Sequence, residues 1–312
     1  MTNPVSRSRE TLARRIAITG SSGLIGSALM RALESRGDTV LHVVRRTALA
    51  PHELSWNPEA GTIEAAKLDG VDGIVNLAGE NLAQRWSDSA KRRIYDSRVK
   101  GTALLARTIA ALDQKPSVLL SGSAVGIYGD RGDELLDESS ASGSGFLADV
   151  CRAWEAATSV ASAAGVRVVH LRTGLVLASH GGLLQKMLKP FRFGVGGKLG
   201  SGGQWMSWIV LEDHVRAMLS LLDAPLNGAV NLTAPNPVTN SKFTKVLAHV
   251  LARPSFFTVP KFALELAMGE MADETALVSQ RAIPKRLLEA GFAFQQPTLD
   301  GALRSVLTRS AR

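Results

Sequence analysis

The pattern of apolar and polar positions predicts that strands alternate with helices through the first half of the chain. Short apolar runs, which are typical of strands buried on both faces, occupy residues 16–19, 39–44, 71–77, 118–120 and 166–171. Between them, apolar residues recur at helical spacing over residues 24–35, 87–112 and 149–164. This order predicts an α/β fold, a Rossmann-like, doubly wound parallel sheet with helices on both faces.

The regular alternation ends near Leu177, and the pattern beyond it is mixed. Helical patterns follow at residues 183–188, 212–222 and 242–251, and prolines interrupt the helical pattern after them. We therefore expect a basic N-terminus over residues 1–13, a main domain over 14–178 with crossovers into a second lobe, and a smaller mixed lobe over 179–312 that includes a tail at 260–308.

Three glycines separate the first strand from the first helix, in the run Thr19-Gly-Ser-Ser-Gly-Leu-Ile-Gly26. Gly20 permits a sharp turn, Gly23 lets the backbone approach a pyrophosphate, and Gly26 lets the helix pack closely on the strand. Free N–H groups at the start of the helix attract the same anion. A glycine-rich surface turn is the alternative, but the strand before, the helix after and the strand at 39–44 favour a dinucleotide site.

The second strand ends in Arg45-Arg46, where dinucleotide folds contact the adenosine ribose. An acidic residue there would bind a ribose 2′-hydroxyl, whereas arginine suits a 2′-phosphate. A solvated basic turn is the alternative interpretation. We expect the cofactor to be NADP, as NADPH, rather than NAD.

The composition argues against several other classes of protein. With 312 residues, 45% of them hydrophobic and 21% charged, the chain is of ordinary globular composition, and it lacks an apolar run of the ~20 residues that span a bilayer. Of the net charge of +8, the ends supply most, since residues 1–15 hold four Arg against one Glu and residues 304–312 add three Arg. We expect a small-molecule substrate, no nucleic-acid or membrane partner, and a cytoplasmic location.

Cysteine and histidine usage argues against a disulfide and a metal site. Cys151 is the single cysteine, so no intrachain disulfide can form. The six histidines show no paired metal-binding spacing, and we expect no metal. In its apolar helical context, Cys151 is expected to be a small buried residue rather than a reactive thiol.

Four motifs resemble those of the extended short-chain dehydrogenase/reductase family: residues 19–26, Asn76-Leu-Ala-Gly79, Ser121-Gly-Ser-Ala-Val-Gly-Ile-Tyr-Gly129 and Leu171-Arg-Thr-Gly-Leu-Val176. The runs at 267–271, 284–292 and 297–303 resemble the tail of an atypical subgroup, labelled epimerase family or nucleoside-diphosphate-sugar epimerase. Motifs and resemblance together imply that NADP(H) is bound by Thr19, Gly20, Ser21, Ser22, Gly23, Leu24, Ile25, Gly26, Arg45, Arg46, Leu77, Ala78, Gly79, Ser121, Gly122, Arg172, Gly174 and Leu175.

The family's chemistry uses a Ser or Thr, a Tyr, and a Lys four residues after that Tyr. Ser123 matches the family Ser. The helix that should carry Tyr-x-x-x-Lys instead offers Phe146 with Val150 or, shifted by one residue, Leu147 with Cys151, and neither pair can exchange a proton or present a cation.

Four other residues have two interpretations each. Tyr128 is a conceivable substitute acid, although its place in the loop after Ser123 fits a pocket wall as well. Arg98 stands where extended members carry Asn; it could be a spectator, but we expect it to face the pocket and contact an anion of the substrate. Trp205 and Trp208 could stack on a base or sugar or pack in the core.

His214 follows two acidic residues at a helix start, so a surface helix cap is expected for it. For the whole chain, two functional hypotheses remain. One is an NADP-dependent oxidoreductase or epimerase acting on a small polar substrate such as a nucleotide sugar. The other is a non-catalytic NADP(H)-binding redox sensor or partner-binding module. A monomer and a homodimer are both compatible with the sequence.

Overall fold

The opening strand is buried on both faces because its residues alternate between two cores. In the computed structural model, which describes residues 13–308, Ile16 and Ile18 of β1 (Arg15–Thr19) enter one core and Ala17 enters the other. Each of these side chains is fully buried. A strand covered on both sides reads as an uninterrupted apolar run, which is the pattern that predicted it.

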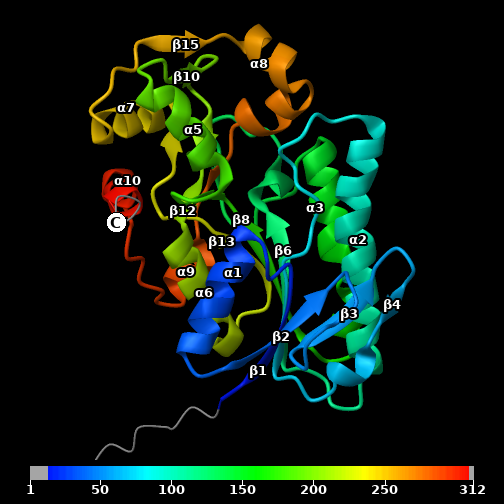
Figure 1. The fold of residues 1–312 in the computed structure, drawn as a ribbon. Coiled ribbons are helices and arrows are strands. Elements are labelled where there is room, and N and C mark those ends of the chain that lie inside the picture. Colours follow the sequence, from blue (N-terminus) through cyan, green and yellow to red (C-terminus); the bar gives the residue numbers. More distant parts are fainter. Residues whose placement is uncertain (1–12, 309–312) are drawn as a thin grey trace, which may run out of the picture.

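β1 lies between β2 and β5 in an eight-stranded sheet (Figure 1). Every neighbouring pair is parallel except β3 with β4. The prediction of a doubly wound parallel sheet is therefore confirmed, and the opening strand lies inside it. In spatial order the strands are β13 (Gly228–Leu232), β8 (Arg167–Thr173), β6 (Val118–Ala124), β5 (Gly73–Asn76), β1, β2 (Thr39–Val44), β3 (Glu53–Asn57) and β4 (Thr62–Ile63).

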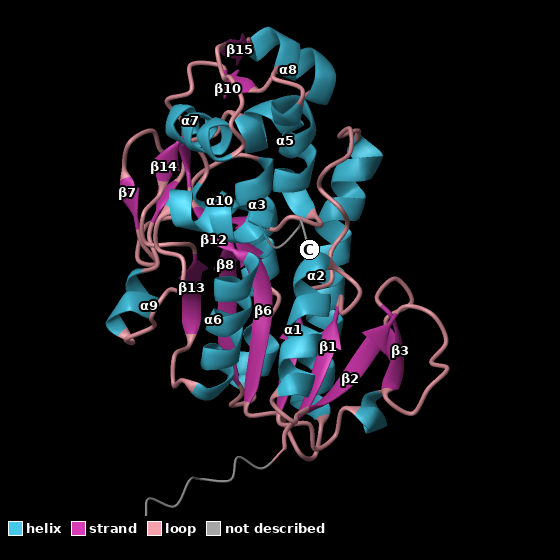
Figure 2. Cartoon of the chain, turned by 60° about the vertical axis from the view of Figure 1, so that its left-hand side comes forward, coloured by secondary structure: helices cyan, strands magenta, loops and turns pink. Residues whose placement is uncertain are grey.

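Helices cover both faces of this sheet (Figure 2). One face packs against α1 (Leu24–Ser35) and α6 (Leu211–Asp223), with Leu29, Leu33, Val215 and Met218 in the shared core. The other face packs against α2 (Asp88–Ala111) and α4 (Ser159–Ala163), and α3 (Phe146–Ala156) lies beside α2. No helix among residues 13–308 is long and apolar enough to cross a membrane.

The sheet extends further at both edges than the sequence predicts. β3 is not among the strands that the sequence predicts, but it pairs with β2 and buries Leu54 and Trp56. At the other edge β13 pairs with β8, although it lies beyond residue 178, the expected end of the sheet. The chain thus returns from the second lobe to the sheet, while the division into domains at residue 178 stays a prediction.

The second lobe stands beyond the carboxyl ends of the central strands and has a core of its own (Figures 1 and 2). Phe191, Trp208 and Phe243 are buried in that core, and Leu299 and Leu303 from the last helix join them. The lobe's elements are β9 (Leu175–Leu177), α5 (Gly182–Arg192), β10 (Gly197–Leu199), β11 (Trp205–Met206), β12 (Trp208–Val210), β14 (Val238–Thr239), α7 (Asn240–Val250), β15 (Phe257–Val259), α8 (Lys261–Met268) and α10 (Leu299–Thr308).

Small elements tie the tail to the first half. β16 (Arg281–Ala282) pairs in parallel with β7 (Leu135–Leu136). Their neighbours are a 3-10 turn at Val125–Tyr128, a π-helical turn at Ala272–Ala276 and α9 (Lys285–Glu289); a further 3-10 turn spans Ala65–Lys67.

A buried hydrogen-bond chain joins four elements at the carboxyl edge of the sheet. The Thr19 hydroxyl donates to Asn76 Oδ1 at 2.7 Å, and Asn76 Nδ2 donates to Thr102 Oγ1 at 2.8 Å. The indole N–H of Trp154 donates to the same Thr102 oxygen at 2.9 Å. Thr102 therefore accepts bonds from both β5 and α3 while it belongs to α2.

Replacing Thr102 by Val tests this chain, because Val keeps the shape and removes the acceptor. Two buried donors, on Asn76 and Trp154, would lose their partner at about 1–3 kcal/mol each. We expect urea denaturation to show a loss of about 2–5 kcal/mol in the free energy of unfolding. Thr108→Val is the matched control, since Thr108 donates only to Leu104 O in its own helix. Equal losses for the two variants would contradict the role assigned to Thr102.

Candidate functional site

The turn from β1 into α1 has no room for side chains at two of its glycines. Gly20 has φ +70°, and a Cβ there would lie 2.8 Å from the Leu77 carbonyl. A Cβ on Gly26 would lie 2.2 Å from Gly20 O. These contacts bring α1 against β1, and α1 begins after Gly23 without a side-chain cap on its first N–H groups.

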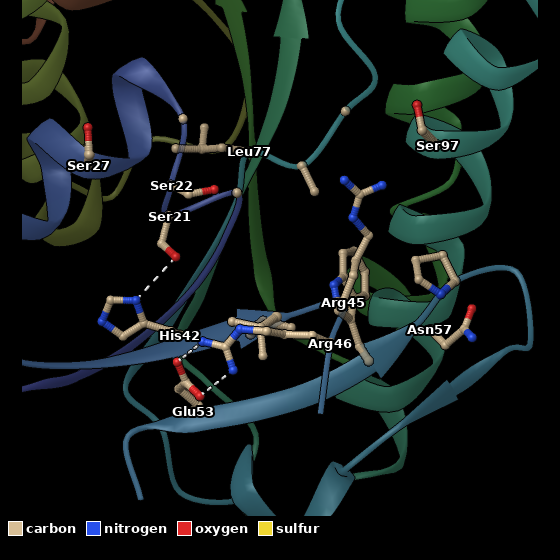
Figure 3. A pocket seen from close by; sticks show the side chains of 18 of the residues that line it. Ser21, Ser22, Ser27, His42, Arg45, Arg46, Glu53, Asn57, Leu77 and Ser97 are labelled. Atoms are coloured by element: carbon tan, nitrogen blue, oxygen red, sulfur yellow. Dashed lines mark hydrogen bonds and ion pairs between the residues drawn. The ribbon is translucent and has the colours of Figure 1, made fainter. Parts of the chain in front are cut away.

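A cavity of about 840 Å³ opens over this turn (Figure 3). It lies between the glycine turn, the ends of β2 and β5, and strand β3. Nine residues of the predicted cofactor set line it: Gly20, Ser21, Ser22, Gly23, Arg45, Arg46, Leu77, Ala78 and Gly79. The turn and the strand ends therefore meet at one groove, as the order of the motifs predicts.

The structure separates the two arginines at the end of β2. Arg46 donates two hydrogen bonds to the carboxylate of Glu53, one of them at 2.8 Å, while Arg45 extends into the cavity (Figure 3). The hydrogen bond from Arg46 and one from the Leu49 backbone lower the pKa of Glu53 to about 2. Within residues 13–308, Arg45 has no ion-pair partner. One cation is thus neutralised and the other remains available to an anion.

Beyond the cavity, the end of β6 carries Ser123 into a buried ion-pair network. The Ser123 hydroxyl donates to Glu155 Oε1 at 2.7 Å. Arg172 holds the same carboxylate with Nε at 2.9 Å from Oε1 and Nη2 at 3.0 Å from Oε2. Burial alone would raise the pKa of Glu155, but hydrogen bonds from Arg172 and Ser123 outweigh it and lower that pKa. Glu155 is therefore a carboxylate at neutral pH.

Tyr128 belongs to the same network and lies in the interior. Its side chain is fully buried, and its hydroxyl accepts from Arg172 Nη1 at 3.1 Å and donates to Asn231 Oδ1 at 2.8 Å or to Asp137 O at 3.0 Å. Burial raises the pKa of this hydroxyl. A role for Tyr128 as the substitute acid stays a prediction, and its burial disfavours that role.

The start of α3 offers apolar groups where the Tyr and Lys would stand. The ring of Phe146 packs edge-on against Trp86, with centroids 5.2 Å apart, and Glu274 from the tail accepts the N–H groups of Phe146 and Leu147 at 3.1 Å each. Cys151 is buried, and its burial raises the pKa of the thiol to about 11. The expectation of a small buried cysteine is confirmed, and this side chain is neutral at pH 7.

Arg98 lies between the cavity and α3. Its guanidinium packs on Gly79, where a Cβ would be 3.1 Å from Arg98 Cζ, and it stands 5.2 Å from the centroid of the Trp154 ring. It donates to the carbonyl oxygens of Ile94 and Glu80, both at 3.1 Å. Burial lowers the pKa of Arg98 from its ordinary value. Its remaining N–H groups leave it able to bind an anion, which stays a prediction.

Comparison with known proteins identifies the family. A sequence model of the NAD dependent epimerase/dehydratase family matches residues 16–233, which is most of the chain. This chain belongs to that family. A domain of unknown function, DUF1731, matches residues 259–306 of this family member. The resemblance stated from the motifs and the tail is therefore confirmed.

Relatives match this family member along nearly its whole length. An epimerase family protein of Mycobacterium bovis is 47% identical over 296 residues, which cover 94% of this chain and 98% of that protein. The crystal structure of human epimerase family protein SDR39U1, isoform 2, with NADPH is 32% identical, has a TM-score of 0.87, and covers 94% of this chain and 99% of that chain. That of a nucleoside-diphosphate sugar epimerase from Corynebacterium glutamicum is 39% identical, with a TM-score of 0.79, and covers 95% of this chain and 58% of that chain.

One expectation for this epimerase family member is wrong. His214 was expected to cap a helix at the surface, but α6 begins at Leu211 and turns His214 inward, where it is fully buried. Its Nε2 lies 3.0 Å from Thr173 Oγ1, and burial lowers the pKa of the imidazole to about 3. Packing against the sheet, rather than the acidic neighbours in sequence, decides the orientation of this side chain.

The structure also separates the two tryptophans. Trp208 is fully buried in the core of the second lobe, with its N–H donated to Asn236 O. Trp205 is half-buried, and the guanidinium of Arg281 lies 4.3 Å from its ring centroid. Core packing is thus the correct interpretation for Trp208, and neither residue lines the cavity beside the glycine turn.

The remaining predicted residues lie at the ends of neighbouring strands. Ser121, Gly122 and Ser123 end β6, while Arg172, Gly174 and Leu175 lie at the end of β8 and the start of β9. Sequence reasoning missed three residues that act on this region: Glu53, Glu155 and Glu274. Glu53 and Glu155 each stand between neutral or apolar neighbours, which is a weak signal in the sequence, whereas Glu274 follows Asp273 directly and has no such signal.

Replacing Glu155 by Gln should leave Arg172 buried without a counter-charge. Removing one partner of a buried ion pair costs about 3–5 kcal/mol, so we expect a loss of that size in the free energy of unfolding at pH 7. Because the pKa of Glu155 is lowered from 4.5 in the folded chain, its contribution is present above about pH 4.5 and is lost as the pH falls through the folded pKa.

Chemical denaturation across pH 3–7 measures the free energy of unfolding of wild type and of Glu155→Gln. Differences of ~0.5 kcal/mol or less are not interpreted. The difference in the free energy of unfolding between the two proteins should become smaller as the pH falls. Glu59→Gln, at an exposed ion pair with Lys100, is the control and should cost nothing measurable. A pH-independent difference would contradict the charge assigned to Glu155.

Proposed function

We propose that this protein binds NADPH in the groove above the glycine turn and is an NADPH-dependent oxidoreductase of the epimerase family. The observation that carries the proposal is the position of Arg45. It enters the cavity at the end of β2 as an unpaired cation among the described residues, while Glu53 neutralises Arg46. A 2′-phosphate is the part of NADPH that such a cation would distinguish. The likeness to human SDR39U1, crystallised with NADPH, supports the same cofactor.

The residues present fit this cofactor. The cavity of about 840 Å³ lies within the ~300–1,000 Å³ range of ligand pockets. The uncapped N–H groups at the start of α1 favour a pyrophosphate, and Gly23 leaves the approach to them open. Leu77, Ala78 and Gly79 supply the opposite wall.

Bound NADPH would supply a hydride at the nicotinamide, and the chain would orient the substrate. Ser123 gives its only hydroxyl hydrogen to Glu155, so it can offer only lone pairs to a substrate. It therefore suits a substrate hydroxyl that donates a hydrogen bond. Arg98 would bind an anionic group of the same molecule. Because Phe146 and Cys151 cannot exchange a proton, the substrate or water would have to carry it.

These groups favour a small polar substrate with a hydroxyl and an anionic group. A nucleotide sugar has both. The relative from Corynebacterium glutamicum, described as a nucleoside-diphosphate sugar epimerase, supports this class.

A second candidate is a non-catalytic NADPH-binding sensor or partner-binding module. Two features of the site favour this candidate. Cys151 is buried and neutral, and the hydroxyl of the neighbouring Ser123 already donates its hydrogen to Glu155. No group among the described residues at the start of α3 can then take the role of the Tyr and Lys.

Cofactor preference tests the first part of the proposal. Wild type should bind NADPH about ten- to a hundredfold more tightly than NADH, roughly 1.4–2.7 kcal/mol, and the preference should fall as salt rises. Arg45→Ala should erase the preference and leave NADH affinity nearly unchanged. The matched control is the double variant Arg46→Gln with Glu53→Gln. It removes an ion pair whose net charge is zero, so it should keep the preference for NADPH over NADH. Titration calorimetry measures all of these affinities.

Equal affinities of wild type for the two cofactors would overturn the assignment of Arg45. Binding of neither cofactor would overturn the assignment of the glycine turn itself.

Measurements of turnover test the second part of the proposal, that the protein is an NADPH-dependent oxidoreductase. With NADP⁺ and a panel of nucleotide sugars, NADPH formation should be detectable by its absorbance, and Ser123→Ala should lower kcat/KM by about a hundredfold, roughly 2.7 kcal/mol. Cys151→Ser should leave turnover nearly unchanged. A comparable loss for a folded Cys151→Ser variant would mean that the thiol takes part. Tight NADPH binding without turnover of any sugar would support the sensor instead.

A further inference from the structure

Acidic residues are absent from two long stretches of the second half. Residues 179–211 and 224–264 hold no Asp or Glu, and each stretch holds four basic residues. The body of the chain is nearly neutral as a whole, but its acidic and basic residues are therefore unevenly distributed along the sequence. The basic excess is not confined to the two ends, where the sequence analysis placed it.

The fold brings parts of both stretches together at one end of the molecule. β10 pairs in parallel with β15, with Gly197 opposite Phe257. Arg253 Nε donates to Arg192 O at 3.1 Å, which joins the end of α5 to the loop before β15. Figures 1 and 2 both place β10 and β15 at the end farthest from β1. We name this surface the basic aromatic tip, formed by Lys189, Arg192, Phe193, Arg253, Phe256 and Phe257.

Large apolar side chains protrude from this tip. Phe256 is 90% exposed, Phe193 83% and Phe257 53%. Among the described residues, no acidic side chain pairs with Lys189, Arg192 or Arg253, so the phenylalanines share this end of the molecule with uncompensated positive charges. Clustered exposed apolar side chains of this kind mark interaction surfaces.

The surface without acidic residues ends on α8, although exposed apolar side chains continue onto that helix at Phe262 and Leu266. There Lys261 binds both Glu265 and Asp273, and acidic residues become frequent again. No residue of the tip lines the cavity above the glycine turn. Binding at the tip is therefore separate from cofactor binding, and it does not depend on the proposed function.

The chemistry of the tip selects among possible occupants. A second copy of the same face would bring like charges together, which opposes self-association. Phenylalanine beside Lys and Arg, on a protruding end, is the combination that inserts at the boundary of lipid headgroups and acyl chains while it attracts anionic lipids. Such binding needs no membrane-spanning helix, so it departs from the expectation of no membrane partner, which rested on the lack of a spanning segment.

We propose that the basic aromatic tip docks this protein on the surface of an anionic lipid bilayer. Phe193 and Phe256 enter the headgroup boundary, and Lys189, Arg192 and Arg253 contact lipid phosphates. The interaction is peripheral and weakens as salt rises.

Vesicle flotation tests the proposal with the full chain. Wild type should float with vesicles of phosphatidylcholine and phosphatidylserine at low salt, and should not float with phosphatidylcholine alone. Phe193→Ser with Phe256→Ser should lower the partition coefficient at least about tenfold. Lys189→Glu with Arg192→Glu should do the same. All variants should keep the NADPH affinity and melting temperature of wild type.

Matched controls lie elsewhere on the surface. Leu49→Ser removes another apolar side chain that is 80% exposed, and Arg107→Glu reverses an exposed charge on α2. Both controls should float like wild type. The proposal is overturned if wild type ignores anionic vesicles or if the tip variants float unchanged. It is equally overturned if the tip variants abolish self-association in sedimentation, or binding of a single-stranded oligonucleotide, while vesicle binding is absent.

Discussion

The contact between Gly26 and Gly20 is the constraint on which the site depends. A side chain at Gly26 would overlap Gly20 O, so only hydrogen at this position lets α1 lie directly against the end of β1. That approach aims the uncapped N–H groups of α1 at the cavity. The same turn brings Gly20 against the Leu77 carbonyl, so the ends of β1 and β5 form one continuous wall. The close contact between Gly26 and Gly20 therefore serves both the packing of α1 on β1 and the binding of the cofactor.

A buried charge pair lies beside Ser123, the residue that matches the family serine. Glu155 and Arg172 hold each other from α3 and β8, and the Ser123 hydroxyl points its hydrogen at that carboxylate. The family serine thus accepts rather than donates toward the groove. Tyr128 joins this pair through Arg172, whose Nη1 donates to its hydroxyl. Ser123, Glu155, Arg172 and Tyr128 thus form one network, on a chain that lacks the family's Tyr and Lys.

Local patterns in the sequence predict the first elements well, and contacts that form only when strands and helices pack together account for the failures. The helix at Leu24–Ser35 and the strand at Thr39–Val44 have their predicted bounds, because periodicity and glycine placement are local signals. β3 reads Glu-Leu-Ser-Trp-Asn between Pro51 and Pro58, so it lacks the continuous apolar run that predicted β1. Glu53 neutralises Arg46 across two neighbouring strands, a contact that exists only after they pair. His214 shows the same limit, since the sheet decides which face of α6 is buried.

The C-terminal tail forms part of the second lobe, and it also contributes to the candidate site. Glu274 caps the start of α3 by accepting the N–H groups of Phe146 and Leu147, and Gly145 before them has φ +109°, a backbone conformation that favours glycine. An acid at a helix N-terminus is favourable, and here it comes from a segment more than a hundred residues away. The π-helical turn that carries Glu274 lies within the domain of unknown function at 259–306. The start of α3, where the family keeps its Tyr, is therefore held by the tail, so the tail and the altered chemistry of α3 belong to one structural unit.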